Sequence, residues 1–229
     1  MSLEYLFEKI NILQHDCITI TELPVTNPNA DSELIIISGF SEASYEQNYK
    51  TLFVDYNEKL QTNKFKKVHL VKFVNNQVRN LHQEIFSIKE KPNTNILGNL
   101  ENLLYKKCGD ILFEKLDKNT LYSILAKSAG AGPAIFLCNT HPENFKHLSL
   151  FAPGVKFINK SIKKVCTKFP KTIVGWNSPD KKVRLVDVWF TLNNVLPDDT
   201  KLYTYYFPNS SEFFDTQHEI NTKFFENII

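Results

Sequence analysis

Three polar residues have the types needed for nucleophilic chemistry, and each of them follows an apolar segment. Ser128 lies in the small-residue run LAKSAGAG at 125–132, directly after apolar residues. Asp180 lies in an Asn-Ser-Pro-Asp cluster after the apolar segment 172–176, and His218 comes after the segment 201–207. An imidazole that takes the proton of a serine hydroxyl makes it a nucleophile, and a carboxylate can orient that imidazole. The three residues could therefore carry out acyl transfer if the fold brings them together.

The small residues around Ser128 fit two interpretations. A strand that turns at once into a helix strains the residue at the turn and requires tiny neighbours two positions away, here Ala126 and Gly130. The Ala129 amide would then lie at a helix N-terminus, where free N–H groups favour negative charge. The same run would also let a helix pack closely on a sheet around a structural Ser128, and Asp180 could simply cap a helix or lie in a turn.

The hydrophobic pattern predicts alternating strands and helices. Alternation over 11–23 predicts one or two edge strands, and apolar runs predict buried strands at 33–39, 67–73, 121–125, 147–151, 172–176 and 201–207. Helical stripes predict helices over 45–60, 100–116, 129–138, 155–169, 184–196 and 218–229. The Asn-rich segment 75–97 predicts a long loop with room for one helical turn. This alternation predicts an α/β fold, a mostly parallel sheet flanked by helices on both faces, with a ligand site beyond the carboxyl ends of the strands.

Composition and charge exclude several classes of function. The 229 residues are 42% hydrophobic and 23% charged, as in an ordinary globular protein, so we expect one domain over 1–229. A formal net charge of +2 provides no basic field for nucleic acid, and no stretch reaches the roughly 20 apolar residues of a membrane span. The first residues lack a signal-peptide pattern, so we expect a cytoplasmic protein. The cysteines are far apart, which predicts reduced thiols at Cys17, Cys108, Cys138 and Cys166.

The chain order of Ser128, Asp180 and His218 resembles the α/β-hydrolase family, in which nucleophile, acid and histidine follow one another in this order. The resemblance covers residues 33–229. It depends on the elbow AKSAG at 126–130, the Ala-Pro-Gly stop at 152–154, Asp180 with a valine three positions later, and His218 before a C-terminal helical pattern.

The same resemblance implies an oxyanion site made of two backbone amides. One would belong to Phe40, in the Ser-Gly-Phe-Ser turn at 38–41, and the other to Ala129. Two departures from the family pattern concern the same region. Ala126 stands where the family usually has glycine, and Ser38 stands where it often has histidine.

A triad of this kind implies a serine hydrolase acting on a carboxylic ester or thioester through an acyl-enzyme intermediate. It needs no metal or organic cofactor, and no cluster in the sequence has metal-ligand spacing. Only residues 155–170 fill the interval where the family usually inserts a cap. We therefore expect an open pocket for a small-molecule acyl ester, partly covered by the segment 75–97 and by a basic helix whose lysines form a solvated face.

Other interpretations stay open at this point. The fold could serve as an inactive binding module in which Ser128 is structural, and a lyase or transferase would use the same three residues. Three further carboxylates could replace Asp180 as the acid: Asp187, Asp198 and Asp199. Of the six histidines, His141 and His147 flank a helix end and a strand start, away from the predicted carboxyl edge, which favours His218 as the base.

Overall fold

A computed structural model of the protein describes residues 3–23, 27–41, 64–88, 94–155, 170–177 and 185–205. The described strands are β1 (Ile18–Glu22), β2 (Glu33–Ile37), β3 (Val68–Phe73), β4 (Tyr122–Lys127), β5 (Phe145–Phe151), β6 (Lys171–Asn177) and β7 (Lys201–Tyr205). The described helices are α1 (Leu3–Asn11), α3 (Gln77–Phe86), α4 (Thr94–Glu114), α5 (Ala131–Thr140) and α6 (Leu185–Asn193). A short 3₁₀ turn, Ser128–Gly130, connects β4 to α5.

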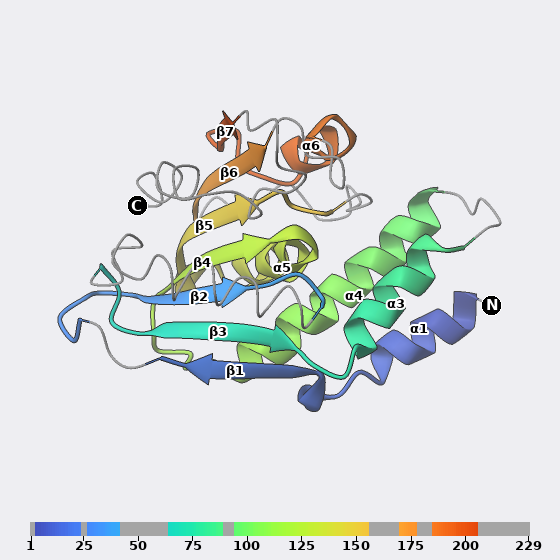
Figure 1. The fold of residues 1–229 in the computed structure, drawn as a ribbon, viewed down its shortest axis with the longest axis horizontal. Helices are drawn as coiled ribbons and strands as arrows, with labels where there is room; N and C mark the ends of the chain where they lie inside the picture. The colour runs from blue at the N-terminus through green and yellow to red at the C-terminus, as the bar shows by residue number, and fades with distance from the viewer. Residues whose placement is uncertain are drawn as a thin grey trace.

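The described strands form one seven-stranded sheet in the order β1-β3-β2-β4-β5-β6-β7. The edge strand β1 pairs antiparallel with β3, and all the other pairs are parallel. In Figure 1 the β1 arrow points against those of its neighbours. The predicted mostly parallel sheet with an edge strand near the N-terminus is therefore confirmed. The carboxyl ends of β2, β4, β5 and β6 consequently share one edge of the sheet.

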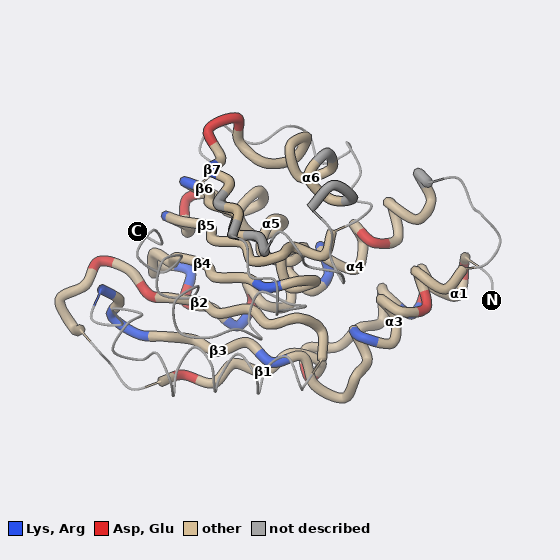
Figure 2. The backbone as a smooth tube through the Cα atoms, turned by 45° about the horizontal axis from the view of Figure 1, so that its top comes forward, with Lys and Arg blue, Asp and Glu red and all other residues tan. Residues whose placement is uncertain are grey.

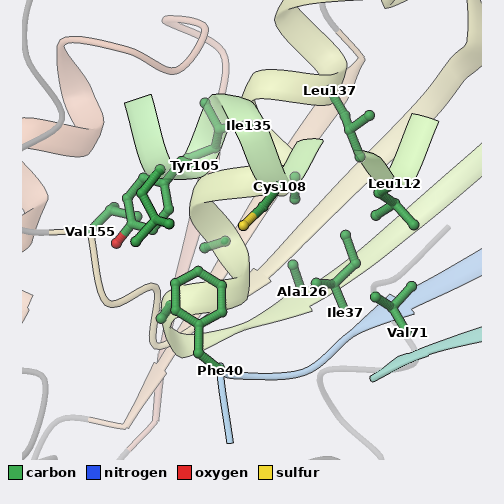
Figure 3. Close-up of a cluster of buried hydrophobic side chains, with 14 of the residues drawn as sticks. Ile37, Phe40, Val71, Tyr105, Cys108, Leu112, Ala126, Ile135, Leu137 and Val155 are labelled. Carbon is green, nitrogen blue, oxygen red and sulfur yellow. The ribbon is translucent and has the colours of Figure 1, made fainter. Parts of the chain in front are cut away.

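One face of the sheet carries the main core. Equivalent positions of five neighbouring strands form an apolar row: Val71, Ile37, Ala126, Leu150 and Val174. All five are buried in one cluster with side chains from all five described helices. Figure 3 shows part of this cluster, with Cys108 and Leu112 of α4 above the strand residues. Burial of this apolar surface is the main source of stability for such a sheet.

The helices α4 and α5 on this face are buried to different extents. In α4 the buried residues recur at helical spacing: Leu100, Leu104, Cys108, Ile111 and Leu112. In α5 seven of the ten residues are buried, because this helix packs on the sheet and also against α4. A glycine allows the two helices to approach closely, because a Cβ at Gly132 would lie 2.3 Å from the Tyr105 ring. The packing of α4 on α5 therefore depends on this missing side chain.

The opposite face of the sheet is also buried. On four strands, residues next to those of the apolar row point to this face and are buried: Ile36, Leu70, Leu125 and Ile173. A central strand that is buried on both faces reads as a continuous apolar run, which is the pattern of 33–37. The helices predicted over 45–60, 155–169 and 218–229 lie outside the described residues.

The structure corrects the predictions from sequence at two places. The segment 75–97 is not a long loop, because it holds α3 and the first turn of α4. α3 buries Val78, Leu81 and Ile85, whose spacing is helical but whose neighbours are almost all polar, so the stripe is thin. At the N-terminus the structure adds α1, which buries Leu6 and Ile10. Both helices pack on α4 and derive their stability from that contact rather than from strong local propensity.

Charged residues are spread over the described part of the chain. Figure 2 shows basic and acidic positions interspersed along strands and helices. Several form ion pairs between distant segments, including Lys67 with Glu22 at 2.9 Å and Lys146 with Asp31 at 2.8 Å. This mixture agrees with the small net charge of the whole sequence.

Candidate active site

Ser128 follows the last residue of β4, at the edge where the parallel strands end. Its φ is 51°, one of four positive values among the non-glycine residues of the described chain. Lys127 before it is still extended, with φ −115° and ψ 143°, and Gly130 after it is already helical, with φ −64° and ψ −16°. The chain therefore changes from strand to helix within three residues, and the serine takes the strained conformation at the turn.

The neighbours of Ser128 are small because other backbone segments lie against them. Ala126 is fully buried and pairs with Ile37 of β2 on one side and Leu150 of β5 on the other. A Cβ on Gly130 would lie 2.1 Å from the carbonyl oxygen of Ser38. A small residue is thus needed at position 130 because the turn after β4 contacts the turn after β2.

The turn after β2 carries Phe40 and contacts this elbow through Ser38. The Ser38 hydroxyl donates to the Gly39 carbonyl at 2.9 Å and lies 3.4 Å from the Val71 carbonyl. The Phe40 side chain is buried against aromatic rings, with its centroid 4.7 Å from that of Phe73. Within the described chain, neither the Phe40 nor the Ala129 amide donates a hydrogen bond. An N–H in the first turn of a helix has no partner within that helix.

A third turn closes onto Ser128 from β5. Ala152 has φ 37°, and its N–H donates to the Gly175 carbonyl of β6 at 3.0 Å. The Gly154 N–H donates to the Ser128 carbonyl at 2.9 Å. A Cβ on Gly154 would lie 3.3 Å from both the Ser128 Oγ and the Ala129 nitrogen. The turns after β2, β4 and β5 therefore meet around one serine.

The predicted acid and base, Asp180 and His218, lie outside the described residues, as does the segment 178–184 that contains Asp180. β6 ends at Asn177, at the same edge as Ser128, so the chain enters the Asp180 segment from that edge. Of the reserve acids, Asp187 lies in the first turn of α6.

Asp198 and Asp199 are placed at the wrong edge for the acid. Both are exposed and directly precede β7, which is parallel to β6. They therefore lie at the amino edge of the sheet, opposite to Ser128. The sequence alone could not exclude them, because exclusion needs the direction of β7.

The other histidines have separate environments. His147 and His69 lie near the amino edge, and His69 pairs with the buried Glu33. Burial, and then the nearby Lys146 and Lys171, lower the pKa of His147 to about 4. His141 stacks on Phe113 with ring centroids 3.5 Å apart.

Unlike these histidines, His82 lies close to the turn after β2. The sequence did not single it out, because the residue was assigned to a loop. It lies in α3, with its ring 5.2 Å from that of Phe40 and its Nε2 3.2 Å from the Tyr105 hydroxyl. The Tyr105 hydroxyl also contacts Glu101, one turn earlier in α4, at 2.7 Å. The spacing of Glu101 and Tyr105 on a helix was visible in the sequence, but their proximity to Phe40 was not.

Solved structures of other proteins share this arrangement of strands and helices. They include dienelactone hydrolase from Anabaena variabilis, with a TM-score of 0.55, 13% identity and coverage of 93% of this chain and 92% of that one. Esterase PE8 has a TM-score of 0.53, 13% identity and coverage of 93% and 99%. MGS-MChE2, an α/β hydrolase enzyme from a sediment metagenome of the Mar Chica lagoon, Morocco, has a TM-score of 0.53, 16% identity and coverage of 91% and 93%.

The chain has the α/β-hydrolase fold. No protein-family model matches the sequence, and no curated protein matches it significantly. At identities this low, the likeness concerns the α/β-hydrolase fold and not the reaction. In this fold, the carboxyl edge of the sheet is where ligands bind, and Ser128 lies there.

Three further observations concern the described residues. They include no group of three or more His, Cys, Asp and Glu side chains that could hold a metal ion. None of the described helices is long and apolar enough to cross a membrane. Cys17, Cys108 and Cys138 are buried free thiols, and burial raises the pKa of each. These three are therefore reduced thiols, as the sequence predicted, and they belong to the core, whereas Cys166 lies outside the described residues.

Proposed function

We propose that the protein is a serine hydrolase that cleaves a small carboxylic ester or thioester through an acyl-enzyme on Ser128. The observation that carries the proposal is the left-handed backbone of Ser128 between a buried strand and a helix, with the Ser38 carbonyl packed against Gly130. Strain at a non-glycine residue persists only where the surroundings hold it, and it concentrates at active sites. The activities in the names of esterase PE8 and dienelactone hydrolase support an ester as the substrate class.

In this mechanism the Ser128 Oγ attacks the acyl carbon while His218 takes the hydroxyl proton. Asp180 holds the imidazole in the tautomer whose free nitrogen faces the serine, and it stabilises the imidazolium that forms. The imidazolium then protonates the leaving alcohol or thiol. Water then attacks the acyl-enzyme and gives a proton to His218. The imidazolium returns this proton to the Ser128 Oγ as the bond to the acyl group breaks, which releases the carboxylic acid and regenerates the serine.

The negative charge of the tetrahedral intermediate would be stabilised by the amides of Phe40 and Ala129. Support comes from the turns that hold the two amides, which touch at the contact between Ser38 and Gly130. Removing one donor of an oxyanion site typically costs about a hundredfold in turnover or more. The mechanism requires no metal or organic cofactor.

A fluorophosphonate probe, which reacts with activated serines, tests the proposal. We expect it to label the wild type and Ser123→Ala but not Ser128→Ala, and we expect hydrolysis of a short p-nitrophenyl ester to follow the same pattern. Ser123 is a suitable control because it lies in β4, the strand that leads into Ser128, and is 1% exposed. A folded wild type that takes no label would contradict the proposal and favour a binding module built on the same fold.

A further inference from the structure

Tyr105 lies on α4, and its side chain packs against the start of α5 and lies close to the turns after β2 and β5. Its ring packs against the backbone of Gly132, just after the elbow. The same ring lies 5.9 Å from that of Phe40, in the turn after β2. Its hydroxyl lies 3.5 Å from the carbonyl oxygen of Gly154, in the turn after β5. Figure 3 shows this hydroxyl pointing toward the turn that holds Val155.

The Tyr105 hydroxyl belongs to a buried hydrogen-bond network in which the donors and acceptors can be assigned. Tyr105 is fully buried, and burial, together with the nearby Glu101 carboxylate, raises the pKa of its phenol well above the ordinary range. The phenol therefore keeps its single hydrogen, and the Glu101 carboxylate at 2.7 Å is its nearest acceptor. The oxygen is then left to accept, so His82 must carry a hydrogen on Nε2, which lies 3.2 Å away.

Each segment that lies next to Tyr105 has a separate part in the proposed reaction. The Gly132 contact positions the start of α5 behind Ser128 and Ala129, and the Phe40 contact positions the turn that carries the second amide. Gly154, whose carbonyl faces the Tyr105 hydroxyl, also donates its N–H to the Ser128 carbonyl. One side chain thus lies against the segments that carry the nucleophile and the two amides.

We propose that Tyr105 is a positioning residue for the reaction at Ser128, with Glu101 and His82 fixing its hydroxyl. This inference rests on the proposed serine-hydrolase function. Tyr105 itself does not touch the reacting atoms. It holds Ser128 in position relative to the amides of Phe40 and Ala129, which stabilise the negative charge that develops in the transition state. Its loss therefore lowers kcat with little effect on KM.

The test compares Tyr105→Phe with Tyr122→Phe, using ester hydrolysis, fluorophosphonate labelling and thermal unfolding. Tyr122 is a matched control, because it is 1% exposed and its hydroxyl is also hydrogen-bonded, to the backbone of Asp117, but at the amino end of β4. Both variants lose one buried hydroxyl. We expect Tyr105→Phe to lower kcat and the labelling rate about tenfold, with KM within about twofold, and Tyr122→Phe to leave the kinetics unchanged.

A second pair of variants keeps the test informative if Tyr105→Phe folds poorly. His82→Gln retains an N–H donor for the Tyr105 oxygen, whereas His82→Ala removes it, so we expect kcat to be restored in the glutamine variant relative to alanine. Tyr105→Phe keeps the ring contacts with Gly132 and Phe40, so it tests the hydroxyl and the residues that fix it. If the wild type is labelled and active but Tyr105→Phe matches Tyr122→Phe in kcat, or His82→Gln matches His82→Ala, the positioning role of the fixed hydroxyl is wrong and the proposed function stands. A folded wild type that is neither labelled nor active overturns both.

Discussion

Replacing Gly130 with alanine is the most direct perturbation of the contact that defines the elbow. The new Cβ would lie 2.1 Å from the Ser38 carbonyl oxygen and 3.0 Å from the Ile37 Cγ2, whereas ordinary contacts begin at 3.4 Å. The two turns would have to separate by about 1.3 Å. Overpacking of this kind costs about 1–3 kcal/mol.

Backbone conformation gives part of this free energy back. Gly130 has the helical values φ −64° and ψ −16°, so alanine is favoured there by about 0.5–1 kcal/mol. The net destabilisation should therefore be at most about 2.5 kcal/mol, which for a chain of this length lowers Tm by up to roughly 10 °C. The effect on the proposed activity should be larger, because the separation moves the Phe40 amide away from Ser128. We expect kcat to fall at least about a hundredfold.

Thermal unfolding and p-nitrophenyl ester hydrolysis measure the two effects. Gly109→Ala provides the control, since Gly109 lies within α4 and its Cβ would be 3.3 Å from the Pro133 carbonyl, a contact that a small shift relieves. We expect this variant to remain active, with a free energy of unfolding within about 1 kcal/mol of the wild type. A Gly130→Ala protein as stable and as active as Gly109→Ala would refute the assigned contact between the turns.

Two further predictions concern charge. The folded pKa of His147 is about 4 against an ordinary 6.5, so the unfolded chain binds this proton first and the free energy of unfolding should fall as the pH drops from 6.5 to 4. After allowance for partial exposure the loss is about 1–2 kcal/mol, measured by urea unfolding, and a His147→Gln variant that kept the full wild-type slope would contradict the assignment. For the acid, we expect Asp180→Asn to lower ester hydrolysis at least about a hundredfold, while Asp198→Asn and Asp199→Asn keep wild-type rates, and loss of activity in either of these would contradict their placement at the amino edge.

Local patterns in the sequence were enough to determine the fold class and the position of Ser128. The apolar runs at 33–39 and 67–73 and the helical stripe at 100–116 each correspond to an element of the structure. Hydrophobic periodicity reports which side of an element is buried, and this depends on the element alone. The tiny neighbours Ala126 and Gly130 likewise indicated a sharp turn. The weak stripe of α3 lies in a polar segment, so it was indistinguishable from a loop.

Only the tertiary structure decided which residues meet. The contact of Gly130 with Ser38 depends on β2 lying beside β4, and the exclusion of Asp198 and Asp199 depends on the direction of β7. The approach of Tyr105 to Gly154 joins residues 49 positions apart, and its bond with His82 joins two helices. Such contacts follow from strand order and helix packing, which a local pattern does not encode. The sequence by itself therefore determined most of the described elements and the candidate nucleophile, and the packing of the sheet decided the surroundings in which that serine lies.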